Sequence, residues 1–288
     1  MNTGGLKYQY ARLNIAEKLI AINVLVFVVN GLFLGLGNVA LDQWFHLPKD
    51  FYDFLKQPWS LVTYAFFHGG FMHLFWNMLM LYFTGRIFLN LFPAKRFINV
   101  YFLGAILGGL IFLLSYNIFP TLLGINAVLV GASASVTAVL IYICTYIPNQ
   151  EVRVFIFNVK LWYIGVAFIL IDLIQIPYGG NVGGNLAHLG GALLGYVYAR
   201  QVQKGRDIGE GFSNGLDAIA TLFKRQEKKS PLKTVYKKKK GSAKSTVNYD
   251  KESHQRKIDA ILDKISKAGY ESLSKAEKDF LFKAGKGN

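Results

Sequence analysis

The chain has 288 residues and a formal net charge of +15, with 52% hydrophobic and only 17% charged residues. A typical soluble domain carries about 25% charged residues, so this composition argues against an ordinary soluble enzyme. It also excludes a wholly disordered chain, because such chains lack the apolar residues that build a core.

The charge divides the chain into two regions. The first 200 residues carry a net charge of +5, and the last 88 carry +10. We therefore expect a membrane domain followed by a basic, soluble tail. Cys144 is the single cysteine, which excludes an intrachain disulfide or a cysteine-based zinc site, and we expect it to be a small buried residue.

Six apolar segments are candidates for membrane helices, which need about 20 mostly apolar residues. In chain order they are residues 19–38, 59–83, 97–116, 128–147, 161–176 and 182–199. The predicted fold is an all-α membrane protein, with a six-transmembrane-helix bundle over residues 19–200 after a cytoplasmic N-terminus of residues 1–18.

The loop charges predict the orientation of this bundle, because lysine and arginine concentrate in cytoplasmic loops. With the N-terminus inside, nine basic residues are cytoplasmic and two are outside. The nine are Lys7, Arg12, Lys18, Arg86, Lys95, Arg96, Arg153, Lys160 and Arg200, and the two are Lys49 and Lys56. The predicted topology therefore has both termini in the cytoplasm.

Several polar residues lie inside these segments, where they are costly and are usually functional or paired. They are His68, His73, Asn77, Ser133, Asp172 and His188. The predicted topology places Ser133, His188, His73 and Asn77 at a similar depth, in the outer half of three different helices. This alignment marks a candidate site.

Ser133 follows Gly131 and Ala132 at the expected start of the fourth helix. An isolated serine in a membrane helix most often bonds to the helix backbone. A helix start, however, offers free backbone N–H groups that can stabilise an oxyanion formed when a serine attacks a carbonyl.

His188 is followed by Gly191 one turn later and by Gly195 one turn beyond that, and these glycines form a face of small residues on the sixth helix. Ala134 and Ala138 have the same spacing on the fourth helix. If these faces meet, His188 comes within reach of Ser133, and a neutral imidazole can then accept the serine proton.

His73 and Asn77 are four residues apart and share one helical face, so both can donate hydrogen bonds toward a developing oxyanion. We favour a structural role for His68 over a catalytic one. The histidines have neither an HExxH pattern nor an acidic partner in sequence, so we expect no metal and no cofactor.

Together these motifs resemble the rhomboid family of intramembrane serine proteases. The resemblance covers residues 19–200 and rests on Trp59, on His68-Gly-Gly-Phe-Met-His73-Leu-Phe-Trp-Asn77, on Gly131-x-Ser133, and on Ala187-His188-Leu-Gly-Gly191-x-x-x-Gly195. Each piece alone is weak, but their joint order and spacing are specific.

The resemblance implies a serine endopeptidase that cleaves transmembrane proteins in or near their membrane segments. Ser133 is then the nucleophile and His188 the general base of a dyad. His73, Asn77 and the Ser133 backbone N–H stabilise the oxyanion, while His68, Gly131, Gly191 and Gly195 are structural. The expected location is a bacterial cytoplasmic membrane. One alternative is a proteolytically inactive rhomboid-like protein that binds membrane clients, and another is a small transporter or channel.

Three positions depart from the family pattern. Ala134 stands where glycine usually follows the serine, Ser60 follows Trp59 where arginine is common, and Thr137 replaces an aromatic residue that often packs on the catalytic histidine. None of these changes removes a catalytic atom, so we expect an active enzyme. For Asp172, which has no obvious partner in sequence, we favour a structural role.

The tail is predicted to contain a basic, disordered linker over residues 201–250 and a small helical module over 251–288. The basic residues concentrate at Lys224, Arg225, Lys228, Lys229, Lys233, Lys237–Lys240 and Lys244. We expect them to bind anionic lipid rather than nucleic acid, because base-stacking aromatic residues are nearly absent. Helical periodicity and a Ser-x-x-Glu capping box at Ser274 predict a short helical hairpin.

Overall fold

The computed structural model describes residues 5–119, 127–154, 156–178, 180–223 and 247–285. The chain forms two compact units, Met1–Arg225 and Gln226–Asn288. Most of the described residues are helical, and the strands are short.

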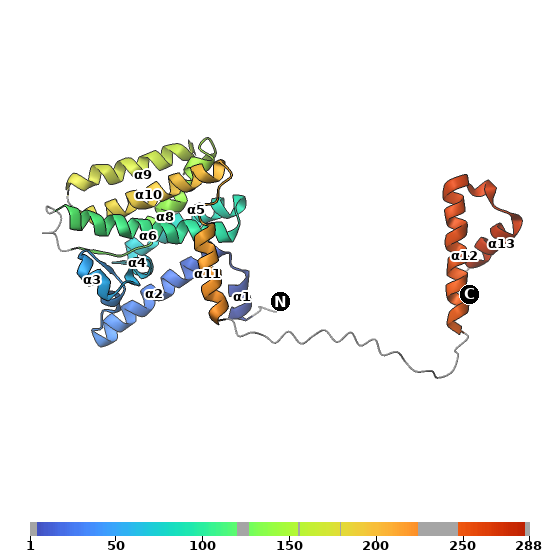
Figure 1. Ribbon diagram of the computed structural model, residues 1–288, viewed down its shortest axis with the longest axis horizontal. Coiled ribbons are helices and arrows are strands. Elements are labelled where there is room, and N and C mark those ends of the chain that lie inside the picture. The colour runs from blue at the N-terminus through green and yellow to red at the C-terminus, as the bar shows by residue number, and fades with distance from the viewer. Residues whose placement is uncertain (1–4, 120–126, 155, 179, 224–246, 286–288) are drawn as a thin grey trace. The chain divides into compact units, whose positions relative to one another are not determined.

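The first unit has a helix at each of the six predicted segments (Figure 1). These helices are α2 (Ile15–Gly37), α5 (Phe71–Leu91), α6 (Ala94–Ile118), α8 (Ser133–Tyr146), α9 (Leu161–Gln175) and α10 (Val182–Gln203). The shorter elements are α1 (Leu6–Arg12), η1 (Leu41–Trp44), α3 (Phe51–Lys56), α4 (Ser60–Thr63), η2 (Tyr64–Phe66) and η3 (Ile176–Tyr178).

Three of the described helical segments are long and apolar enough to cross a membrane, namely Ile15–Gly37, Ala94–Ile118 and Leu161–Tyr178. They support a membrane protein, whereas the count of six spans and the cytoplasmic termini remain predictions. Helix α8 has 14 residues and is therefore only about 21 Å long at 1.5 Å per residue.

The second predicted segment, residues 59–83, is not one continuous helix. It contains the short elements α4 and η2, then a break at Phe67–Gly70, and α5 begins only at Phe71. The break coincides with His68 and two glycines, which form no regular helical turn. As a result, His73 and Asn77 lie in the first two turns of α5.

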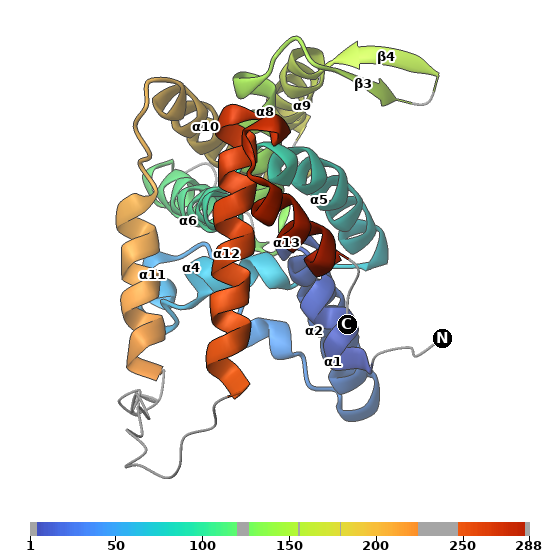
Figure 2. The ribbon, with the colours of Figure 1, turned by 90° about the vertical axis from the view of Figure 1, so that its right-hand side faces the viewer.

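Two small two-stranded antiparallel sheets also belong to the first unit. Strand β1 (Leu47–Pro48) pairs with β2 (Val128–Leu129), so the first long loop is tied to the segment just before α8. Strands β3 (Glu151–Val154) and β4 (Phe157–Lys160) connect α8 to α9 and project from the ends of these helices (Figure 2).

Helices α6, α8 and α10 pack closely at the centre of the first unit through small side chains. A Cβ atom added at Gly191 would lie 2.1 Å from the carbonyl oxygen of Ala134, and one at Gly195 would lie 2.3 Å from that of Ala138. Only glycine permits this approach, so the predicted meeting of the two small-residue faces is confirmed.

The predicted linker over residues 201–250 is wrong at both ends. Helix α11 (Glu210–Phe223) occupies its first part, and α12 begins at Val247. Phe212, Leu216 and Ile219 recur at helical spacing, a pattern that the basic composition of the tail as a whole concealed, although α11 itself contains no lysine or arginine. The basic run Lys224–Lys244 lies outside the described residues.

Helix α11 is joined to α6 by polar contacts. Ser213 donates a hydrogen bond to Asn99 (2.8 Å), and Arg96 pairs with Asp207 (3.0 Å), which also accepts a hydrogen bond from Tyr198. Burial alone would raise the pKa of Asp207, but these hydrogen bonds outweigh it and keep the pKa below 3.8. The ends of α6, α10 and α11 therefore meet around one partly buried carboxylate.

The second unit contains the predicted helical hairpin. It consists of α12 (Val247–Ala268), η4 (Tyr270–Ser272) and α13 (Lys275–Gly285). Ser274 and Glu277 form both hydrogen bonds of the predicted capping box. Glu277 also pairs with Lys264 of α12 at 3.0 Å, which joins the two helices.

Candidate active site

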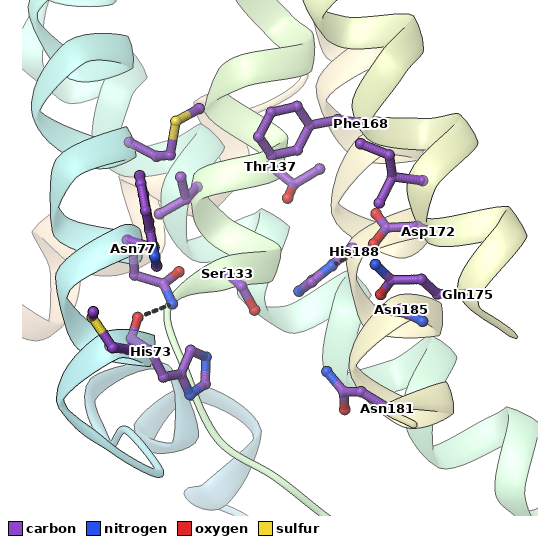
Figure 3. A pocket seen from close by; sticks show the side chains of 15 residues that line it. His73, Asn77, Ser133, Thr137, Phe168, Asp172, Gln175, Asn181, Asn185 and His188 are labelled. Carbon is purple, nitrogen blue, oxygen red and sulfur yellow. Dashed lines mark hydrogen bonds and ion pairs between the residues drawn. The ribbon is translucent and has the colours of Figure 1, made fainter. Parts of the chain in front are cut away.

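All four predicted catalytic residues line one cavity of about 580 Å³ in the first unit. Ser133 comes from α8, His188 from α10, and His73 and Asn77 from α5, while α9 closes the opposite side. Figure 3 shows the side chains of Ser133 and His188 pointing toward one another across this cavity. Residues far apart in the sequence are thus brought to one place.

Ser133 is the first residue of α8, as the sequence predicts. The first N–H groups of a helix have no intrahelical partner, so the backbone here offers free donors next to the serine hydroxyl. Gly131 forms the turn before the helix with a φ of +117°, a conformation that favours glycine. Its N–H donates to the carbonyl oxygen of Tyr64 at 3.0 Å, which anchors the turn.

His73 lies directly against this turn. A Cβ atom added at Gly131 would lie 2.6 Å from Nε2 of His73 and 3.7 Å from Oγ of Ser133. The absence of a side chain at Gly131 is therefore what admits the imidazole beside the serine, which gives Gly131 the structural role that the motif implies.

His68 supports the same turn. Its Nε2 accepts a hydrogen bond from the backbone N–H of Ala132 at 3.4 Å, and its ring lies 5.1 Å from that of His73. His68 is not among the residues that line the cavity. This placement agrees with a structural role.

Asn77 is buried one helical turn after His73. One of its Nδ2 hydrogens is donated to the carbonyl oxygen of His73 at 2.9 Å, drawn as a dashed line in Figure 3. An amide group has two such hydrogens, so a second donor remains for a ligand in the cavity.

Asp172, for which the sequence indicates no partner, also lines this cavity. Its Oδ1 lies 2.9 Å from Nδ1 of His188, although the two are 16 residues apart on different helices. Asp172 is 7% exposed. The signal available in the sequence was a single carboxylate in an apolar helix, and only the packing of α9 on α10 reveals its partner.

The three departures from the family pattern have distinct surroundings. Ala134 packs directly against Gly108, where an added Cβ would lie 2.6 Å from the Ala134 Cβ. Ser60 is fully buried outside the cavity. Thr137 lines the cavity, and among the described residues no aromatic ring contact involves His188.

Comparison with known proteins finds similar chains in several eukaryotes. The chain is 28% identical over 141 residues to the presenilin-associated rhomboid-like protein A, mitochondrial, of Danio rerio. The aligned part covers 48% of this chain and 36% of the relative. It is 29% identical over 160 residues to the RHOMBOID-like protein 12, mitochondrial, of Arabidopsis thaliana. Here the aligned part covers 51% of this chain and 47% of the relative. The matched part thus spans less than half the length of these curated relatives. Because both are named as mitochondrial, they do not support the expected bacterial location.

Two families match separate parts of the chain. A family of unknown function, DUF6576, matches residues 244–283, which include most of the C-terminal helical hairpin. The Rhomboid domain matches residues 55–204, from the end of α3 to the end of α10, and this range contains every residue of the candidate site. The chain therefore belongs to the rhomboid family.

Proposed function

We propose that this protein is an intramembrane serine endopeptidase that hydrolyses peptide bonds in or near the transmembrane segments of other membrane proteins. One observation carries the proposal: Ser133, at the start of α8, shares a cavity with His188 and with the donors His73 and Asn77. Membership of the rhomboid family supports the same activity.

In this mechanism Ser133 and His188 act as nucleophile and general base. His188 accepts the Ser133 hydroxyl proton on Nε2 while Oγ attacks the substrate carbonyl carbon. The imidazolium then gives this proton to the departing amine as the peptide C–N bond breaks, which leaves an acyl ester on Ser133. A water molecule, deprotonated by His188, hydrolyses the ester and restores the free serine.

The negative charge on the substrate oxygen is stabilised by donors around Ser133. The candidates are the Ser133 backbone N–H, the remaining Nδ2 hydrogen of Asn77 and the imidazole of His73. Preorganised donors of this kind accelerate acyl transfer because they are aimed at charge that develops in the transition state.

The membrane setting determines what the substrate must do. Helix α8 is shorter than a bilayer core of about 30 Å, which is consistent with a nucleophile below the membrane surface. A substrate helix hides its carbonyl groups in backbone hydrogen bonds, so it must unwind locally before Ser133 can attack.

Cleavage of a reporter with one transmembrane segment, in liposomes, tests the function. Wild type should cut the reporter, and Ser133→Ala and His188→Ala should not. Ser135→Ala is the matched control, because it removes a buried hydroxyl two residues away that does not line the cavity. If Ser133→Ala cuts as fast as wild type, the nucleophile is misassigned. If the wild type binds the reporter without cutting it, the inactive, client-binding alternative is favoured.

We also propose that both termini are cytoplasmic. In a Cys144→Ala background, a cysteine at Asp50 should react with an impermeant thiol reagent from outside, and one at Asn90 should not. The reverse pattern would overturn this topology.

The basic run at Lys224–Lys244 is proposed to bind anionic lipid, at about 1 kcal/mol per charge near the membrane surface. Association of the tail with anionic liposomes should weaken as salt is added. Binding that does not depend on salt would contradict an electrostatic contact.

A further inference from the structure

We propose that Asp172 is a positioning residue that fixes the tautomer and the ring orientation of His188, so that the site operates as a Ser133–His188–Asp172 triad. This inference rests on the proposed function, because it assigns a role within the same proton-transfer machinery. The dyad implied by the motifs contains no acidic member.

The geometry is that of a charge-assisted hydrogen bond. Oδ1 of Asp172 and Nδ1 of His188 are 2.9 Å apart, and the two side chains are 10% and 21% exposed. Both line the cavity that contains Ser133. Figure 3 shows Asp172 on the α9 side of His188 and Ser133 on the α8 side, so the imidazole lies between them.

This contact determines which ring nitrogen holds the proton of a neutral imidazole. An ionised carboxylate can only accept hydrogen bonds, so Nδ1 of His188 must carry the hydrogen that Asp172 accepts. Nε2 is then left with a lone pair, which is the form needed to take the proton of Ser133. After that transfer, the same carboxylate stabilises the imidazolium.

The composition of the surrounding helices supports this role of the Asp172 carboxylate in orienting His188. Asp172 is the single acidic residue of α5, α6, α8, α9 and α10. A carboxylate within an apolar helix is costly unless it is paired. In the part of the chain that the structure describes, its hydrogen-bonding partner is His188, with no lysine or arginine bonded to it.

Aromatic packing does not hold the imidazole of His188. Thr137 lines the same cavity, and in the part of the chain that the structure describes no aromatic ring contact involves His188. A hydrogen bond from the neighbouring helix restrains the imidazole by a different means, and it sets the tautomer as well as the orientation.

Kinetics of the full-length protein in liposomes test the role of Asp172. Asp172→Asn should lower kcat about 100-fold or more with little change in KM, because an amide can donate to Nδ1 and favour the wrong tautomer. Asp172→Glu should recover part of this loss. Leu173→Ala, next to it on α9 and about half exposed (47%), should match wild type. A wild-type kcat for Asp172→Asn would overturn the inference.

A second measurement reads the tautomer without requiring activity. With ¹⁵N-labelled histidine, the side-chain signals of His188 can be assigned by their disappearance in His188→Gln, since the chain has only five histidines. Wild type should show the Nδ1–H tautomer, and Asp172→Asn should shift the population toward Nε2–H. A wild-type Nε2–H tautomer would refute the role of Asp172.

The two measurements separate the failure of this inference from failure of the proposed function. If Ser133→Ala still cuts the reporter, or if the wild type does not cut it, the proposed protease mechanism is wrong. In that case the NMR signals of His188 alone decide whether Asp172 sets the tautomer. If Ser133→Ala is inactive but Asp172→Asn retains both the wild-type kcat and the wild-type histidine signals, the proposed protease function is supported and the role of Asp172 is refuted.

Discussion

The first unit, called here the membrane unit, and the C-terminal hairpin hold their helices together by different means. In the membrane unit, glycines bring α10 so close to α8 that an added Cβ at Gly191 would meet the Ala134 carbonyl at 2.1 Å. In the C-terminal hairpin, the helices are joined by an ion pair between Lys264 and Glu277, with Ile261 and Leu273 as its buried apolar residues.

This difference agrees with the solvents predicted for the two units, lipid around the apolar helices of the membrane unit and water around the C-terminal hairpin. Lipid provides no hydrophobic drive between apolar helices, so close packing of small residues has to stabilise their contact. In water, exposed ion pairs contribute about 0–1 kcal/mol each to the free energy of folding, and the burial of apolar side chains contributes most of the stability. The membrane unit should therefore be intolerant of added atoms, and the hairpin tolerant of lost charges.

The largest effect is expected from adding atoms to the α8–α10 contact. Gly191→Val should prevent the two helices from approaching, with loss of folded protein and of reporter cleavage. Gly180→Ala is the control, because a Cβ there meets no atom within 4 Å. Yield in detergent and thermal unfolding measure the outcome, and a normally folded, active Gly191→Val would show that the contact is not needed.

Removing a donor from the cavity should leave the packing intact but slow the reaction. Asn77→Ala should lower kcat about 100-fold, as loss of one oxyanion donor does in other enzymes, with little change in unfolding temperature. Thr84→Ala is the matched control on α5, since Thr84 makes the same kind of bond to the preceding turn, 2.7 Å from Met80 O, outside the cavity. Equal rates for both variants would remove Asn77 from the mechanism.

In the hairpin, loss of a helix cap should cost less. Ser274→Ala removes the side chain that caps α13 and should destabilise that helix by about 1 kcal/mol, seen as faster amide hydrogen exchange over residues 275–285 of the full chain. Ser272→Ala, which removes a hydroxyl bonded to Gly269, should leave α13 unchanged. Reporter cleavage should be unaffected by either variant, and a loss of cleavage would show that the units are coupled.

The smallest effect concerns pH. Hydrogen bonds from the Ser274 backbone N–H and from Lys264 lower the pKa of Glu277 from 4.5 to about 2. Because the folded pKa is depressed, the stabilisation is complete above about pH 4.5 and is lost as the pH falls toward 2. Hydrogen exchange over α13 should quicken in that window in wild type and show no such step in Glu277→Gln. A step near pH 6 instead would implicate another group.

Much of the site could be predicted because its residues carry local signals. The turn at Gly131, the helix start at Ser133 and the small faces around Gly191 and Gly195 are short-range patterns with direct physical meaning. The cavity that Ser133, His188, His73 and Asn77 share agrees with the similar depth that the loop charges predict for them.

The features that were missed depend on longer-range contacts. Asp172 and His188 are joined only by the packing of α9 on α10, which no periodicity encodes. The apolar composition of residues 59–83 concealed the break at Gly69 and Gly70, because hydropathy averages over a window and ignores backbone geometry. Likewise, the basic composition of the tail concealed the amphipathic pattern of α11.

The order of the site residues along the chain has a consequence for biosynthesis. His188 lies in α10, the last of the six apolar helices, whereas His73 and Asn77 lie in α5 and Ser133 in α8. A chain inserted from its N-terminus therefore exposes its serine to the bilayer before it holds the base that would activate it. Under the proposed mechanism, the growing polypeptide stays inert toward neighbouring membrane proteins until its last helix is in place.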